Sequence, residues 1–264
     1  MKNTSHLIQI FLLLLLVSVC FSLPTNFDWR NVNGQNYCSV VRQQHLPTYC
    51  GSCYIFSSTS AFNDRVKIKY NNTKIDINIS PQEIMNCANV AGCAGGSPSD
   101  VYAYIKKTGA VHETCSPYQA VQMECTAENI CKRCPSYDKP CYAVENPKRW
   151  FASSVGSVSG ETAMMNEIYK NGPVACHLYS DEQLEAWDGG DKVLISPPTN
   201  KHNHWISVVG WGYSKEQKVN YWIVRNSWGV EWNPTESSGG GFFNLIRGQN
   251  ALDIEEICYY AIPK

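Results

Sequence analysis

Residues 50–54 of this 264-residue chain are Cys-Gly-Ser-Cys-Tyr, and the next eight residues, Ile-Phe-Ser-Ser-Thr-Ser-Ala-Phe, begin an apolar pattern near helical spacing. The pattern predicts a helix over 52–70, with Cys53 at its N-terminus. Unpaired amides and the helix dipole favour a thiolate over a thiol at that position. Because acyl transfer requires such a thiolate, Cys53 is a candidate nucleophile.

A cysteine nucleophile needs a base, and the chain has six histidines. His204 leads directly into a predicted strand, which would hold its ring rigidly. Asn226 lies in the segment Tyr-Trp-Ile-Val-Arg-Asn-Ser-Trp-Gly (221–229), and its side-chain carbonyl can accept the imidazole proton and fix the ring. A structural role explains each residue equally well when it is taken alone. The three segments in this order predict a Cys53–His204–Asn226 site.

The order of the predicted elements indicates an α+β fold with a helical front and a β-rich back. Ser80-Pro81-Gln82-Glu83 has the form of a capping box, and Asn171-Gly172-Pro173 would end a later helix. The Cys-dense stretch 115–141 has little periodicity and is expected to be a loop region. Further helices are expected from 80, over 97–109 and over 161–170, and strands over 174–179, 205–211, 221–225 and 242–247.

The segments around Cys53, His204 and Asn226 resemble the three catalytic segments of the papain family of cysteine peptidases. Gly-Cys-Ala-Gly-Gly (92–96) resembles the glycine-rich wall of that family's substrate groove, where glycine lets a substrate backbone approach closely. The start of the family's mature enzymes is similar to Leu-Pro-Thr-Asn-Phe-Asp-Trp-Arg (23–30). The resemblance extends over about residues 23–262.

This resemblance implies one peptidase domain over 23–264, with a helical left half and a β-barrel-like right half. The active-site cleft would lie between the halves. The helical half would take about 45–135 and the β half about 136–250, with both termini crossing between them.

The segment Gln-His-Leu-Pro-Thr-Tyr-Cys (44–50) has three more residues before the catalytic segment than most papain-like enzymes. The insertion resembles a loop of the cathepsin X (cathepsin Z) subfamily that blocks one end of the groove. There its histidine holds the terminal carboxylate of the substrate, so the resemblance implies a carboxypeptidase. An imidazolium at His45 can pair with a carboxylate at mildly acidic pH. The alternative is an ordinary surface histidine in a loop.

The resemblance also implies roles for residues around the nucleophile. Gln44 would donate to the developing oxyanion together with the backbone N–H of Cys53. Trp228 would cover the His204–Asn226 contact, or simply pack in the core. The expected substrate-binding residues are His45, Tyr49, Gly95, Gly96 and Trp228.

The chain has 13 cysteines, of which Cys20 lies in the N-terminal apolar run. Without Cys20 and the nucleophile Cys53, 11 remain, an odd number. The subfamily pattern leaves Cys38 over, either free or linked to another chain. It implies the bridges Cys50–Cys93, Cys87–Cys125, Cys115–Cys131, Cys134–Cys141 and Cys176–Cys258.

Residues 1–22 have the form of a signal peptide, with Lys2, a short apolar run and a small Ser22 before the cut. Many cysteines and sequons at Asn71 and Asn78 suit the secretory pathway, in a lysosome-like compartment or outside the cell. Almost nothing separates this segment from the mature-like start, so no inhibitory propeptide is expected. The hypothesis is a chain that folds unaided and is controlled by pH or location.

The net charge of −1 gives no basic field for nucleic acid or for an anionic membrane, and no membrane anchor is expected. The expected partners are peptide or protein substrates and cystatin-like inhibitors, and the expected state is a monomer. No cofactor and no metal is implied.

Four other interpretations stay open. Cys50 and Cys53 form a C-x-x-C that a redox protein would use. Cys131, Cys134 and Cys141 could bind zinc, although disulfides are more common in an oxidising compartment. The chain could also be an inactive homologue that acts as a binding protein, or an endopeptidase if the 45–49 loop leaves the groove open.

Two departures from the family pattern concern the groove. Tyr54 and Ile55 stand where most relatives carry Trp and many carry Ala. The stretch 233–241 is longer and richer in Ser and Gly than in the subfamily.

Overall fold

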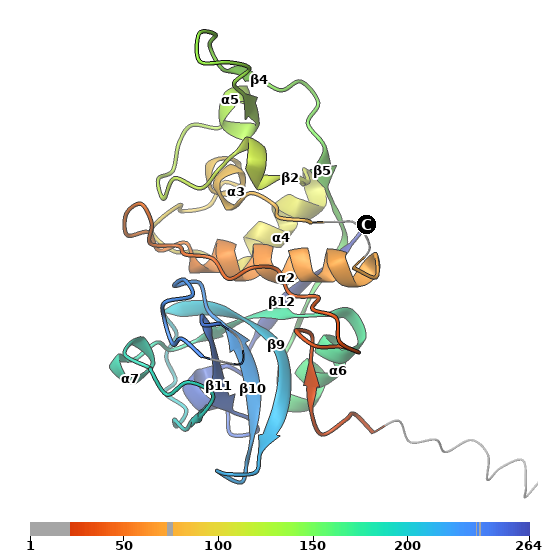
Figure 1. The fold of residues 1–264 in the computed structure, drawn as a ribbon, viewed down its shortest axis with the longest axis vertical. Coiled ribbons are helices and arrows are strands. Elements are labelled where there is room, and N and C mark those ends of the chain that lie inside the picture. The colour runs from red at the N-terminus through yellow and green to blue at the C-terminus, as the bar shows by residue number, and fades with distance from the viewer. Residues whose placement is uncertain (1–21, 73–75, 236, 238) are drawn as a thin grey trace, which may run out of the picture.

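Helix α2 (Cys53–Lys69) crosses the middle of the molecule (Figure 1). On one side of it lie the other helices of the N-terminal half, and on the other side lies a large sheet. The computed structural model describes residues 22–72, 76–235, 237 and 239–264. This arrangement confirms the expected α+β fold.

The helical half contains α3 (Pro81–Cys87) and α4 (Pro98–Lys107). Ser80 caps α3, because its side chain accepts a 2.9 Å hydrogen bond from the backbone N–H of Glu83. The reciprocal half of the predicted capping box is replaced by other contacts. The Glu83 carboxylate accepts from Tyr104 and Arg149, while the backbone N–H of Ser80 donates to Val111.

The Cys-dense stretch is mainly loop, as expected, and holds only short elements. The disulfides Cys87–Cys125, Cys115–Cys131 and Cys134–Cys141 tie it together. The short elements of this half are η1 (Glu113–Cys115), α5 (Ala127–Ile130), β2 (Ala110–Val111), β3 (Lys132–Arg133), β4 (Tyr142–Ala143) and β5 (Arg149–Trp150).

The second half is built on one eight-stranded sheet in the order β6-β12-β7-β9-β10-β11-β8, with β1 (Phe27–Asp28) paired to β9. Among the described residues the pairing does not close, so the barrel-like half is an open sheet. The pairs are antiparallel except β11 with β8. The path strands are β6 (Ala152–Val158), β12 (Cys258–Pro263), β7 (Val174–Leu178), β9 (His204–Ser214), β10 (Val219–Arg225), β11 (Phe242–Ile246) and β8 (Val193–Leu194). Three short helices complete this half: α6 (Glu161–Asn171), α7 (Glu182–Glu185) and η2 (Ala251–Asp253).

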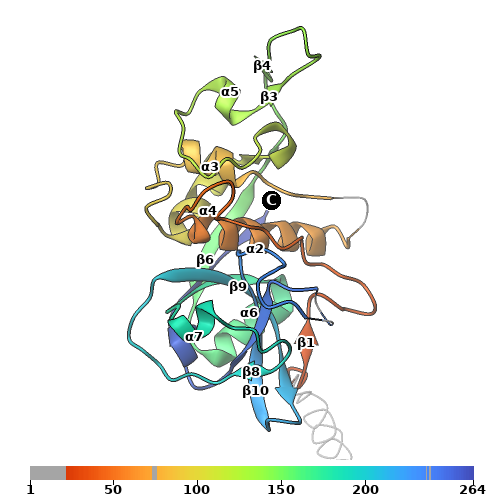
Figure 2. The same ribbon diagram turned by 60° about the vertical axis from the view of Figure 1, so that its left-hand side comes forward.

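Strands β6 and β12 connect the two halves. Both views show them running from the sheet past α2 towards the helical side, where the C-terminus lies (Figures 1 and 2). Ala152 of β6 and Ala261 of β12 are accordingly buried in the core of the helical half. Disulfide Cys176–Cys258 joins β12 to β7 inside the sheet.

Two hydrophobic cores result, one in each half, and α2 lies between them. Its residues from Cys53 to Val66 are all buried. Tyr54 and Phe62 belong to the core of the helical half, while the other core is centred on Trp211 and Trp222 of the sheet. The helix is therefore an internal element and not an amphipathic surface helix.

The predicted signal peptide over 1–22 falls outside the described residues except for Ser22. Among the residues that the structure describes, no helix has both the length and the apolar content to cross a bilayer. Of the two sequons, the one at Asn71 includes Thr73, which is not described. The amide of Asn78 donates to Glu113, and its carbonyl accepts from Arg42 at 2.7 Å.

Candidate active site

Cys53 is the first residue of α2, as the motif predicts. The preceding Ser52 makes no side-chain cap, because its hydroxyl bonds the hydroxyl of Tyr118 at 2.7 Å. No side chain of Ser52 therefore neutralises the positive end of the helix dipole, which favours an anion at Cys53. Burial raises the pKa of the Cys53 thiol to about 11, while backbone hydrogen bonds from Trp205 and Tyr54 act in the opposite direction.

His204 begins β9 and faces Asn226, which follows the end of β10. The ring nitrogen Nε2 lies 2.8 Å from Oδ1 of Asn226, so Nε2 carries the proton and donates it. This leaves Nδ1 as the basic nitrogen. The Trp228 ring stacks on the imidazole, with centroids 4.8 Å apart, and shields the contact from water. The structure thus brings the predicted His204, Asn226 and Trp228 together.

Burial acts on both reacting groups in the same sense, since it favours their neutral forms. It lowers the pKa of His204 to about 4, although the hydrogen bond to Asn226 opposes this change. A lone thiolate or a lone imidazolium is therefore unfavourable here. A transfer of the Cys53 proton to His204 would make both charges at once, and their attraction would offset the loss of solvation.

Gln44 is fixed on every side and is only 2% exposed. The hydroxyl of Ser227 donates to its Oε1 at 2.7 Å, which sets the orientation of the amide. Its Nε2 donates one hydrogen to the carbonyl of Cys50 at 3.0 Å. The second amide hydrogen is left for another acceptor, as an oxyanion donor requires.

The glycine segment lies beside the nucleophile because the disulfide Cys50–Cys93 and a backbone bridge between Gly51 and Ala94 attach it there. Gly95 has φ +93°, and a Cβ on it would meet nothing within 4 Å, so its backbone borders open space. A Cβ on Gly96 would lie 2.6 Å from the Tyr54 ring. Tyr54 itself donates to the carbonyl of Gly92 at 3.0 Å.

His45 lies in the inserted loop and is half-buried. Its ring stacks on Tyr49 with centroids 4.4 Å apart, and Tyr49 is 78% exposed. Its Nδ1 accepts from the backbone N–H of Cys50 at 3.4 Å, so Nε2 carries the proton in the neutral ring. Burial lowers the pKa of His45, and its charge in turn lowers that of His204. The two imidazoles therefore lie within electrostatic reach of each other.

Two residues at the site were missed by sequence reasoning. Gln43 accepts from the backbone N–H of His45 at 3.1 Å and donates to the carbonyl of Trp228 at 2.7 Å. Gln43 thus ties the inserted loop to the residue that covers the imidazole. Ser227 orients Gln44 across 183 positions of sequence. The only signal in the sequence was that Gln43 and Ser227 adjoin the predicted site residues Gln44 and Asn226. Adjacency in sequence does not show a contact.

The cysteines bear on the open alternatives. The five disulfides are the pairs that the resemblance implies, with Cys38 and Cys53 free. Cys50 is bonded to Cys93 and not to Cys53, which argues against a C-x-x-C redox pair. Cys38 is buried, and burial raises the pKa of its thiol.

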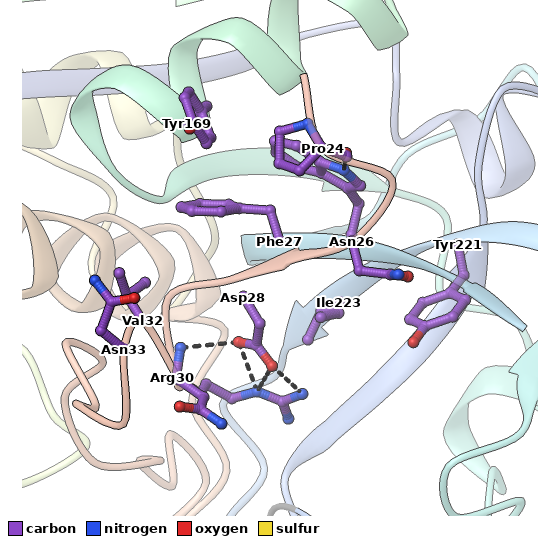
Figure 3. A pocket seen from close by; sticks show the side chains of 12 residues that line it. Pro24, Asn26, Phe27, Asp28, Arg30, Val32, Asn33, Tyr169, Tyr221 and Ile223 are labelled. Atoms are coloured by element: carbon purple, nitrogen blue, oxygen red, sulfur yellow. Dashed lines mark hydrogen bonds and ion pairs between the residues drawn. The ribbon is translucent and has the colours of Figure 1, made fainter. Parts of the chain in front are cut away.

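A pocket of about 580 Å³ lies away from this site, along β1, β9 and β10 (Figure 3). Phe27, Tyr169 and Tyr221 line it, and Asp28 forms an ion pair with Arg30 at 2.8 Å within it. No candidate catalytic residue lines this pocket.

A cysteine at a helix N-terminus and a histidine–asparagine pair at the ends of two sheet strands are the groups that a cysteine peptidase uses, here on an α+β fold. The sequence pattern described as papain family cysteine protease matches residues 23–262, and the chain belongs to this family.

Known proteins agree with this assignment. A cathepsin Z from Onchocerca volvulus is 40% identical over 249 residues, which cover 91% of this chain and 78% of the relative. The solved procathepsin L2 proteinase from Tenebrio molitor larval midgut matches at 28% identity with a TM-score of 0.73, over 92% of this chain and 70% of that one. Bromelain from Ananas comosus matches at 22% identity with a TM-score of 0.72, over 92% of this chain and 100% of that one. The bromelain likeness shows the fold alone.

Proposed function

We propose that this papain-family cysteine peptidase is a carboxypeptidase that removes single C-terminal residues. The observation that carries the proposal is the position of His45. It is half-buried, stacked on Tyr49, tied through Gln43 to Trp228 and electrostatically coupled to His204. The 40% identity to a cathepsin Z supports the same mode.

The chemistry is acyl transfer. The proton of Cys53 moves to Nδ1 of His204, and the thiolate attacks the scissile carbonyl carbon. The carbonyl electrons move to oxygen, where the free amide hydrogen of Gln44 and the backbone N–H of Cys53 donate to it. When the oxyanion collapses, the C–N bond breaks and the leaving amine takes the proton from His204. Water, deprotonated by His204, then hydrolyses the thioester and restores the thiol.

Asn226 keeps the imidazole in the orientation that this sequence needs, because it accepts from Nε2. The stacked Trp228 lowers the local dielectric and strengthens that contact. These roles rest on the geometry and on the family resemblance.

His45 selects substrates by binding their free C-terminal carboxylate. A free C-terminal carboxylate is ionised above about pH 3.5. The ring can bind it through Nε2, which carries a proton in both the neutral and the charged ring, while Nδ1 lies against the backbone of Cys50. This contact fixes the last residue of the substrate just beyond the scissile bond. Gly95 and Gly96 would receive the substrate backbone.

The remaining expectations are part of the same proposal. The chain would act as a monomer on peptides or proteins in an acidic compartment of the secretory pathway or outside the cell. The disulfides suit such an oxidising route. Cystatin-like proteins would inhibit it.

The test uses one peptide in two forms, with a free and with an amidated C-terminus, incubated with the protein at about pH 5 and followed by mass spectrometry. Loss of single residues from the free form only, abolished in Cys53→Ala, is the expected result. Internal cleavage of both forms would make the protein an endopeptidase. No cleavage, together with no thiol labelling of Cys53, would point to an inactive homologue.

A further inference from the structure

A buried ion pair joins α2 to the sheet, next to Asn226 in the sequence and further along the helix that begins at Cys53. Asp64 of α2 and Arg225 of β10 lie 2.6 Å apart, and their side chains are 0% and 1% exposed. Burial opposes the guanidinium charge, but the charge and hydrogen bond of Asp64, together with other neighbouring groups, raise the pKa of Arg225 above its usual value. The guanidinium of Arg225 therefore stays charged inside the protein.

Further hydrogen bonds extend this pair into a network. Arg225 donates through Nε to the hydroxyl of Ser207 at 3.0 Å and through Nη1 to the carbonyl of Ser39 at 3.0 Å. The backbone N–H of Ser39 donates to Asp64 at 2.6 Å. Ser207 and Arg225 are also direct partners across the β9–β10 ladder.

The network touches each element that carries a candidate catalytic side chain. Asp64 is on the helix that begins with Cys53. Ser207 lies three residues after His204 on β9, and Arg225 immediately precedes Asn226. Figures 1 and 2 show α2 lying against β9. One cluster of charges thus fixes the helix of the nucleophile relative to both strands of the base.

We propose that Asp64 and Arg225 are positioning residues that set the separation between the nucleophile and its base. This inference rests on the proposed Cys53–His204–Asn226 chemistry. The planar guanidinium holds three partners in fixed directions, which an apolar contact would not do. Buried ion pairs contribute little stability compared with well-packed apolar residues, so geometric specificity is the better reason for one here.

The chain offers a matched control in the next residue of the same helix. Arg65 is equally buried and pairs with Glu167 at 2.8 Å, and it also donates to the carbonyls of Gly172 and Pro173. These partners lie on and just after α6, and none of them is on β9 or β10. Arg225→Lys and Arg65→Lys are thus the same chemical change at two buried ion pairs of α2.

The experiment measures three quantities for both variants: the thermal midpoint, kcat and KM on a peptide, and the pH profile of iodoacetamide labelling. Mass spectrometry confines the labelling readout to Cys53, because Cys38 is a second free thiol. For Arg225→Lys we expect kcat to fall about 10- to 100-fold with KM nearly unchanged, since small misplacements have such effects. The labelling profile should move to higher pH, because a displaced imidazole stabilises the thiolate less.

Arg65→Lys should lower the thermal midpoint and leave kcat and the labelling profile as in the wild type. If Arg225→Lys does not fold, Ser207→Ala tests the same network more mildly and should lower kcat in the same direction. Variants of the two arginines that lose stability alike and keep kcat and the labelling profile would overturn the inference. A wild-type protein that neither cleaves peptide nor labels at Cys53 would instead refute the proposed function.

Discussion

Replacing His45 with alanine should weaken hydrolysis of peptides that end in a free carboxylate and leave amidated peptides unaffected. The ring is half-buried and presents Nε2 to the substrate, because Nδ1 accepts from Cys50. A hydrogen bond to a charged group contributes about 1.5–3 kcal/mol. At about 1.36 kcal/mol per factor of ten, kcat/KM for the free-acid peptide should fall roughly 10- to 160-fold.

The same contact predicts a pH dependence. The neutral ring already donates from Nε2, and the imidazolium adds an ion pair; burial lowers the pKa of His45 below its usual 6.5. The ionic part of the stabilisation is therefore complete at low pH and is lost as the pH rises through that lowered pKa, which leaves a neutral hydrogen bond. The substrate carboxylate must also be ionised, so the contact is lost again below about pH 3.5.

The assay is kcat/KM for the matched free and amidated peptides between about pH 3 and pH 8, with wild type, His45→Ala and His45→Gln. The glutamine variant keeps a donor without the charge and should recover only part of the loss, without the pH dependence. An equal loss on both peptides would show that His45 acts on the catalytic residues and not on the carboxylate. No loss on either would refute the reasoning.

Three further changes give separate outcomes. Gln44→Ala should lower kcat about 10²–10³-fold through loss of an oxyanion donor, measured under saturating substrate, and an unchanged kcat would exclude that role. Asn226→Ala removes the hydrogen bond that raises the pKa of His204, so it should lower kcat about 10- to 100-fold and move thiol labelling to higher pH; a profile identical to wild type would contradict this. Tyr54→Phe removes the bond to Gly92 and should reduce the free energy of unfolding by about 1 kcal/mol in urea titration, with kcat retained.

Local patterns were sufficient for the parts of the structure that depend on neighbours in sequence. The helix beginning at Cys53, the Ser80 cap of α3, and the strand that follows His204 all depend on residues within one or two turns. The approach of His204 to Asn226 followed from the order of segments already known in the papain family, and not from periodicity.

Features that join distant segments had no such signal. Strand β6 is Ala-Ser-Ser-Val-Gly-Ser-Val, largely exposed and without apolar alternation, so its pairing with β12 was missed. The bond of Ser227 to Gln44 and the pair of Asp64 with Arg225 link residues more than 150 positions apart. Glu83 is the opposite case, because the local motif predicts a bond that the structure replaces. Its carboxylate accepts hydrogen bonds from the distant Arg149 and Tyr104 and does not complete the predicted capping box.

The burial of α2 from Cys53 to Val66 also bears on the autonomy of the two halves. A helix enclosed on all sides serves both cores, so neither half can be complete without it. A fragment ending near residue 135 would expose the face of α2 that β9 and β12 cover, and we expect it to aggregate. A fragment that contains only the sheet would lose α2, and we expect the strands that carry His204 and Asn226 to be less well ordered without it. The two halves are therefore not independent lobes, and we expect substrate specificity to vary through the surrounding loops while the central helix stays constant.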